Sequence, residues 1–125
     1  MRRNERLTSR KSISTLFETG RRIDCYPLRI IFKPGEEDES PLKMAVSVPK
    51  RLFKRAVDRN LLKRRIREAY RLQKPEFLKF FLDAGISTRM MIQYKGRDIE
   101  SYATIEKKLH EALEKLKKKL SEGLT

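Results

Sequence analysis

Basic side chains recur at every fourth position between residues 55 and 71. On a helix, residues spaced by four lie one turn apart on the same face. Like charges at that spacing destabilise an isolated helix, so a face built this way favours contact with phosphate groups over exposure to water alone. We call this set the basic ridge, and Asn60 and Arg64 lie beside it. Its members are Arg55, Arg59, Lys63, Arg67 and Arg71.

The overall composition points to the same kind of partner. The chain of 125 residues has 31 Lys and Arg against 17 Asp and Glu, a formal net charge of +14. Such self-repulsion predicts binding to a polyanion, with nucleic acid as the first candidate and an anionic membrane surface as the second. No apolar run reaches the ~18 residues that a membrane-spanning helix requires, and the opening residues lack the apolar core of a secretory signal. We therefore expect a cytoplasmic protein that works without a membrane.

Residues for catalysis or metal binding are scarce. His110 is the only histidine and is expected to face solvent, so Ser-His-Asp triads and zinc sites of Cys and His are excluded. Cys25 is the only cysteine, and we expect a buried free thiol. The acidic run of residues 36–39 follows Pro34 and Gly35, which is typical of an exposed hairpin loop. We predict no catalytic residue and no metal site in the protein itself.

Apolar periodicity predicts the elements that must position the ridge. Leu62, Ile66, Ala69 and Gln73 should dock the ridge helix on a sheet, opposite the ridge itself. We predict one α+β domain over residues 1–125, a two-layer sandwich of helices on a mostly antiparallel sheet. The expected elements are helix 10–19, a hairpin of strands 28–33 and 44–48, a helix from after Pro49 to about 73, a short helix 76–84 after Pro75, strand 87–94, and a last helix with an apolar stripe at Ile105, Leu109, Ala112, Leu116 and Leu120.

The stretch KMAVSVPKRLFKRAVDRNLLKRRIREAYRL, with its core R-N-x-x-K-R-x-x-R-E at residues 59–68, resembles the protein subunit of bacterial ribonuclease P. NERLTSRKSISTLFETG is similar to the first helix of that family, so the resemblance covers nearly the whole chain. It implies a ribonucleoprotein that removes the 5′ leader from precursor tRNA, and a left-handed β-α-β crossover. The implied partners are the catalytic RNA and precursor tRNA, with no obligate protein partner. The implied catalytic centre is RNA with Mg²⁺, which the RNA subunit and the substrate mainly hold.

The resemblance also implies two sets of binding residues. Glu68 is expected to orient a neighbouring arginine rather than to act as a catalytic acid. The residues expected to bind the catalytic RNA are Arg55, Arg59, Asn60, Lys63, Arg64, Arg67 and Arg71, of which Arg55 and Arg71 follow from the spacing of the basic ridge and the others from the resemblance. Those expected to form a cleft for the leader are Ile13, Phe17, Ile31, Lys50, Arg51 and Lys54.

This chain departs from the family pattern in the cleft. Many members have aromatic residues where Ile13 and Ile31 stand, so only Phe17 keeps the ring on which a base stacks. The segment after the second expected strand is one residue longer than usual and has Phe53 where glycine is frequent.

Three alternatives stay open at this point. A ribosomal protein or RNA chaperone of similar fold would share the basic helix. A DNA-binding regulator would need a short turn between two helices, and a self-sufficient nuclease would need convergent acids.

Overall fold

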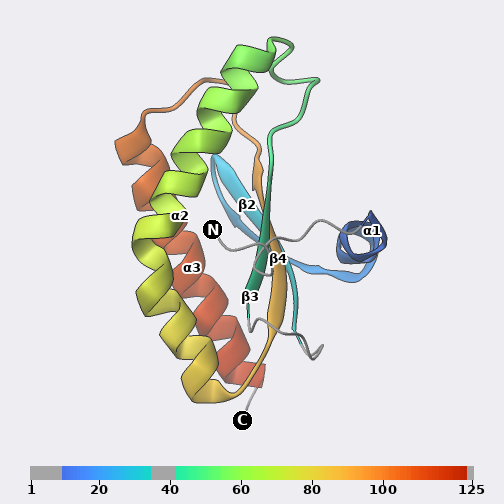
Figure 1. Ribbon diagram of the computed structural model, residues 1–125, viewed down its shortest axis with the longest axis vertical. Coiled ribbons are helices and arrows are strands. Elements are labelled where there is room, and N and C mark those ends of the chain that lie inside the picture. The colour runs from blue at the N-terminus through green and yellow to red at the C-terminus, as the bar shows by residue number, and fades with distance from the viewer. Residues whose placement is uncertain (1–9, 35–41, 124–125) are drawn as a thin grey trace.

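A computed structural model describes residues 10–34 and 42–123. Its centre is a four-stranded sheet in the order β1-β2-β4-β3, with helices on both faces (Figure 1). The α+β class predicted from the sequence is confirmed. The elements are α1 (Arg10–Thr19), β1 (Arg21–Cys25), β2 (Leu28–Pro34), β3 (Leu42–Ser47), α2 (Ala56–Ala84), β4 (Thr88–Tyr94) and α3 (Tyr102–Gly123).

The predicted hairpin of residues 28–33 and 44–48 is wrong, because β4 lies between these two strands. β2 pairs with β4 in antiparallel orientation, and β3 pairs with β4 in parallel orientation. Both central strands have three successive buried residues, Ile30–Phe32 in β2 and Met90–Ile92 in β4. Apolar residues on both faces of a strand are typical of a central strand that is covered on both sides. A hairpin at the edge of a sheet would not need apolar residues on both faces. The acidic run at 36–39, expected in the hairpin loop, lies outside the described residues.

The hairpin that does form joins β1 to β2, and the sequence did not indicate β1. Cys25 pairs with Leu28, so only Tyr26 and Pro27 connect the two strands. Within β1 only Ile23 and Cys25 are buried, and the other three residues are charged and exposed. Two apolar residues are too few to stand out as a strand pattern.

α2 is one continuous helix, whereas the sequence predicted a break before Pro75. Proline lacks the N–H that would bond the carbonyl of Arg71, and it costs about 3 kcal/mol inside a helix. Phe77 and Phe81 continue the buried face of the helix beyond the proline and pack edge to face, with ring centroids 4.9 Å apart. Burial of each ring contributes roughly 1.5 to 3 kcal/mol, which is enough to offset the proline.

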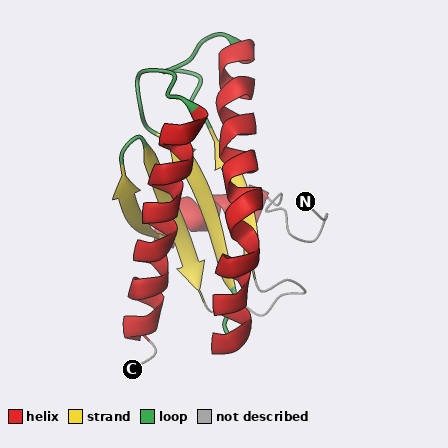
Figure 2. Cartoon of the chain, turned by 90° about the vertical axis from the view of Figure 1, so that its left-hand side faces the viewer, coloured by secondary structure: helices red, strands yellow, loops and turns green. Residues whose placement is uncertain are grey.

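α2 and α3 pack against each other and cover one face of the sheet (Figure 2). Leu62, Ile66 and Ala69 are buried there as predicted, while Gln73 is only half-buried. The predicted apolar stripe of α3 is confirmed, because all five of its residues are buried. The main hydrophobic core lies between this face of the sheet and the two helices.

No helix among the described residues has the length and hydropathy that crossing a membrane requires.

The connection from β3 through α2 to β4 is a crossover between parallel neighbours. α3 lies over β1 and β2, and α2 lies over β3. Viewed with the helices in front of the sheet and the parallel strands pointing up, β4 lies to the left of β3 (Figure 2). The crossover is therefore left-handed, as the resemblance implied, although right-handed connections are the general rule.

In the part of the chain that the structure describes, α1 is the helix on the other face of the sheet, so the architecture has a partial third layer beyond the two predicted (Figure 1). Leu16 packs there against Ile31 and Met91 in a small separate core. Gly20 ends the helix, and its amide donates a 2.8 Å hydrogen bond to the carbonyl of Leu16. A Cβ at Gly20 would lie 2.8 Å from Cγ2 of Ile31, so only glycine allows this close approach.

Candidate nucleic-acid interface

A groove of about 1060 Å³ lies between α1, the edge of the sheet and α2. One wall is apolar and comes from α1, β3 and β4, and the other comes from α2 and is mostly basic. We call it the amphipathic groove. Its lining residues are Ile13, Phe17, Met44, Ala45, Val46, Ser47, Arg64, Arg67, Glu68, Tyr70, Arg71, Lys74 and Met91.

Two successive residues of α1 have opposite environments. Leu16 is 1% exposed and sits in the core beneath the helix, whereas Phe17 is 37% exposed and lines the groove. Successive residues on a helix point about 100° apart, so one can anchor α1 while the other faces the groove. Ile13 is half-buried one turn before Phe17 and also lines the groove. The structure therefore brings these two predicted cleft residues together.

The basic wall comes from side chains spaced three or four residues apart on α2. Arg64, Arg67 and Arg71 are exposed, and Lys74 extends the row by another turn. The sequence prediction did not include Lys74, because the ridge spacing of four leads from Arg71 to Pro75 and the helix was expected to end near residue 73. A run of guanidinium groups on one wall is suited to binding successive phosphates.

Glu68 holds the guanidinium of Arg71 at this wall. Nη2 and Nε of Arg71 donate hydrogen bonds of 2.6 and 3.1 Å to the two carboxylate oxygens of Glu68. The hydrogen bonds from Arg71 lower the pKa of Glu68, and the same pair raises the pKa of Arg71. This geometry agrees with the predicted orienting role of Glu68. A carboxyl group with a lowered pKa is ionised at neutral pH, which does not suit a general acid.

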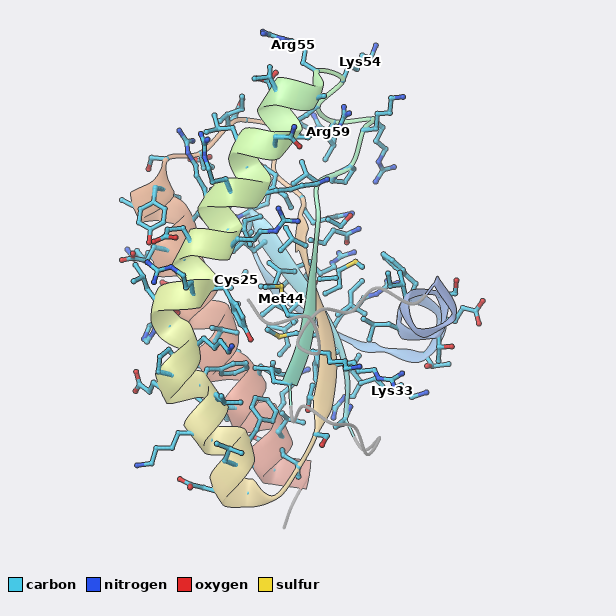
Figure 3. All side chains as sticks on the ribbon, viewed as in Figure 1. Cys25, Lys33, Met44, Lys54, Arg55 and Arg59 are labelled. Atoms are coloured by element: carbon cyan, nitrogen blue, oxygen red, sulfur yellow. The ribbon has the colours of Figure 1, made fainter. Side chains whose placement is uncertain are left out.

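The rest of the basic ridge lies towards the start of α2, away from the groove lining (Figure 3). Asn60 and Arg55 are exposed there, and Nε of Arg55 lies 4.0 Å from the carboxylate of Asp58. Nη1 of Arg59 donates hydrogen bonds of 2.8 and 2.9 Å to the carbonyls of Phe53 and Lys54. Arg59 therefore fixes the preceding loop, a role that the regular spacing of the ridge did not indicate.

The loop before α2 is anchored by Phe53, which is 7% exposed and packs edge to face on Tyr94 with centroids 5.7 Å apart. This burial turns Lys50, Arg51 and Lys54 outwards, and none of the three is in the groove lining. The pKa of Lys95 is lowered mainly by burial, then by the positive charge of Arg29, and then by the positive charge of Arg51.

The predicted cleft residue Ile31 is 1% exposed and packs beneath α1, so it does not line the groove. β3 instead supplies Met44–Ser47, and β4 supplies Met91. The sequence prediction missed these residues because α1 and the parallel pairing of β3 with β4 bring them to the groove. Nothing in their local pattern sets them apart from ordinary strand residues.

No cluster of three or more His, Cys, Asp or Glu side chains that could share a metal ion occurs within residues 10–34 and 42–123. Cys25 is buried as predicted, and its thiol donates a 3.3 Å hydrogen bond to Glu111. Burial raises the pKa of the Cys25 thiol. His110 is exposed on α3, as expected.

Comparisons with known proteins agree on a single family. A family model described as Ribonuclease P matches residues 1–117. The ribonuclease P protein component of Porphyromonas gingivalis is 34% identical over 112 residues, which cover 89% of this chain and 82% of the relative. Among solved structures, the ribonuclease P protein of Staphylococcus aureus superposes with a TM-score of 0.72 at 18% identity, covering 88% of this chain and 93% of that one. The Thermotoga maritima protein gives 0.68 at 21%, covering 89% and 96%.

The sequence matches and the shared fold favour a ribonuclease P protein component over the alternatives. Those alternatives were a ribosomal protein or RNA chaperone, a DNA-binding regulator and a self-sufficient nuclease. At 18% and 21% identity, the solved structures establish only that the fold is shared. The family model and the Porphyromonas gingivalis relative establish the family. The chain belongs to the ribonuclease P family, as a protein component of that tRNA-processing ribonuclease.

Proposed function

We propose that this protein binds the catalytic RNA of ribonuclease P and the 5′ leader of precursor tRNA, and so assists an RNA-catalysed removal of the leader. The observation that carries the proposal is the amphipathic groove, with Phe17 and Ile13 on one wall and Arg64, Arg67 and Arg71 on the other. Single-stranded RNA has apolar base faces and an anionic backbone, so its chemistry complements both walls.

Within the groove, each wall has a separate task. The exposed ring of Phe17 offers a stacking surface for one base, worth roughly 1 to 3 kcal/mol. The guanidinium groups opposite bind phosphates through paired hydrogen bonds, and Glu68 keeps Arg71 in place for this contact. None of these contacts reads a base edge, so the groove accepts leaders of varied sequence.

The remaining ridge residues, Arg55, Arg59 and Lys63, lie outside the groove lining and bind the catalytic RNA together with the neighbouring Asn60. One helix then contacts both RNAs, because its side chains project in several directions around the axis. The exposed loop residues Lys50, Arg51 and Lys54 lie near the start of the same helix and extend this basic surface.

The groove residues do not fit a magnesium site. Mg²⁺ prefers several oxygen ligands in octahedral geometry. Among the described residues that line the groove, Glu68 is the only one with a carboxylate, and both of its oxygens bond Arg71. The RNA and the substrate therefore hold the magnesium ions, and the net charge of +14 on the protein replaces part of the cation requirement.

The test combines the purified protein with a bacterial ribonuclease P RNA and precursor tRNA over a range of magnesium concentrations. We expect correct 5′ ends at a lower magnesium concentration than the RNA alone requires, and no cleavage by the protein without RNA. Metal-dependent cleavage by the RNA-free protein would refute the proposed division of labour. An unchanged magnesium requirement would refute the assisting role.

A further inference from the structure

The loop between β3 and α2 carries three exposed cations around one buried aromatic ring. Lys50, Arg51 and Lys54 are exposed, and we call these three residues the loop cations. Phe53 lies between Arg51 and Lys54 in the sequence, yet it is 7% exposed and belongs to the main core. Lys54 projects outwards beside the start of α2 (Figure 3). The buried ring therefore determines the direction in which the positive side chains leave the surface.

Phe53 packs on a partner that is itself held at both ends. The two rings of Phe53 and Tyr94 meet edge to face, with centroids 5.7 Å apart and planes at 62°. Tyr94 is fully buried at the end of β4. Its hydroxyl group donates a hydrogen bond to the carbonyl of Asp98 and accepts one of 3.1 Å from the amide of Glu100. Tyr94 therefore cannot turn away, and the sheet and the loop before α3 together fix the position of Phe53.

The backbone of the loop is fixed on both sides of Phe53. The amides of Leu52 and Phe53 each donate a 3.2 Å hydrogen bond to the carbonyl of Pro49. On the other side, Nη1 of Arg59 donates hydrogen bonds to the carbonyls of Phe53 and Lys54. These bonds and the ring contact give the loop one defined path, so the loop cations project from fixed positions.

Electrostatic repulsion acts against this arrangement. Residues 50–55 contain four positive side chains, which are the loop cations and Arg55. They directly precede the first turn of α2, where the helix dipole is positive. Asp58 in that turn lies 4.0 Å from Nε of Arg55 and offsets part of the charge. Repulsion would drive the side chains of an unanchored loop apart, so the buried ring keeps the loop cations together against it.

We infer that Phe53 is a positioning residue for binding of the catalytic RNA. It contacts no RNA itself but holds the loop cations in the arrangement in which they bind phosphates. A loop that is already ordered in the free protein loses less conformational entropy on binding, which raises the affinity. The inference rests on the proposed function, which assigns the loop cations to the basic surface for the catalytic RNA.

The test is a double-mutant cycle between the buried ring and the loop cations. The variants are Phe53→Ala, a loop variant with Lys50→Ala, Arg51→Ala and Lys54→Ala, and the combination of all four substitutions. Affinity for the catalytic RNA is measured for each protein at the same salt concentration. We expect Phe53→Ala to weaken binding on the order of tenfold in the wild-type background, because the freed loop must be ordered again on binding. In the loop variant the same substitution should have almost no effect, because no cations remain to be positioned.

A purely structural role of Phe53 would give a different result. The loss of a buried ring lowers the melting temperature whatever its function, so binding is measured at a temperature where circular dichroism shows every variant to be folded. Leu113→Ala is the matched control, because Leu113 is 2% exposed on α3 and far from the loop in sequence. It should lower the melting temperature but leave the affinity for RNA unchanged. If Phe53→Ala does not fold, Phe53→Leu keeps most of the apolar volume and should show a smaller loss with the same dependence on the loop cations.

The cycle separates failure of this inference from failure of the proposed function. An equal loss from Phe53→Ala in both backgrounds, no loss at all, or an equal loss from Leu113→Ala would overturn the positioning role. The loop variant alone should flatten the dependence of log affinity on log salt by roughly 2, since each of three phosphate contacts contributes about 0.7. If the wild-type protein does not bind the catalytic RNA, the proposed function itself fails.

Discussion

Replacement of Phe17 by leucine tests whether the groove holds the leader. Leucine keeps most of the apolar volume but offers no ring for stacking. Phe17 is 37% exposed, so its contribution to the fold is smaller than that of a core residue. We expect the variant to lose well under 1.5 kcal/mol of unfolding free energy, the usual limit for such hydrophobic exchanges in a core.

The effect on binding should be larger and selective. A stacked base is worth roughly 1 to 3 kcal/mol, and leucine retains part of the apolar contact. A loss of about 1 kcal/mol, or about fivefold in affinity, is therefore expected for precursor tRNA with a leader of several nucleotides. Affinity for mature tRNA and for the catalytic RNA should not change, because neither places a leader in the groove.

The neighbouring residue provides the control. Leu16 is 1% exposed, and Leu16→Ala should cost about 2 to 5 kcal/mol of unfolding free energy. Thermal unfolding should separate the two variants by several degrees, and equilibrium binding to precursor and mature tRNA supplies the second readout. If Phe17→Leu weakens precursor and mature tRNA equally, or melts as low as Leu16→Ala with leader discrimination intact, Phe17 belongs to the core and the leader binds elsewhere.

Three further predictions concern the ridge, a helix end and the buried thiol. Ala at Lys63 or Arg67 should reduce the salt slope of RNA binding by roughly 0.7 to 0.9, and Ala at Lys118 by much less; equal effects would indicate nonspecific attraction. Gly85 ends α2 with φ 68°, so Gly85→Ala should cost about 1 kcal/mol in urea unfolding, and Gly85→Asn should cost less. Burial raises the pKa of Cys25, so the pH midpoint of its alkylation should be higher in the native protein than in urea, and equal midpoints would contradict this. Since the unfolded thiol ionises first, this group should lower folding stability as pH rises past the unfolded pKa.

Local patterns were sufficient for the helices and for the kind of partner. The stripe from Ile105 to Leu120 and the buried face around Leu62 and Ile66 follow from a period of 3.6 residues, which depends only on neighbours along the chain. The net charge and the unmixed ridge predicted a polyanion without any knowledge of the fold. The R-N-x-x-K-R-x-x-R-E core and its context were enough to indicate the family.

The sheet and the groove were decided by tertiary structure. β1 has too few apolar residues to be recognised alone, and β4 enters between β2 and β3 only because α2 returns the chain to that position. α2 passes through Pro75 because burial of Phe77 and Phe81 exceeds the local cost of the proline.

The residues that form the groove could not be grouped from the sequence either. Its two walls come from α1 near residue 13, from β3 and β4, and from the middle of α2, segments that only non-local pairing brings together. The sequence alone therefore identified Phe17 and the arginines of α2 by residue type. Which of them share a cavity, and why Ile31 is buried instead, depend on strand register, which single-sequence periodicity does not specify.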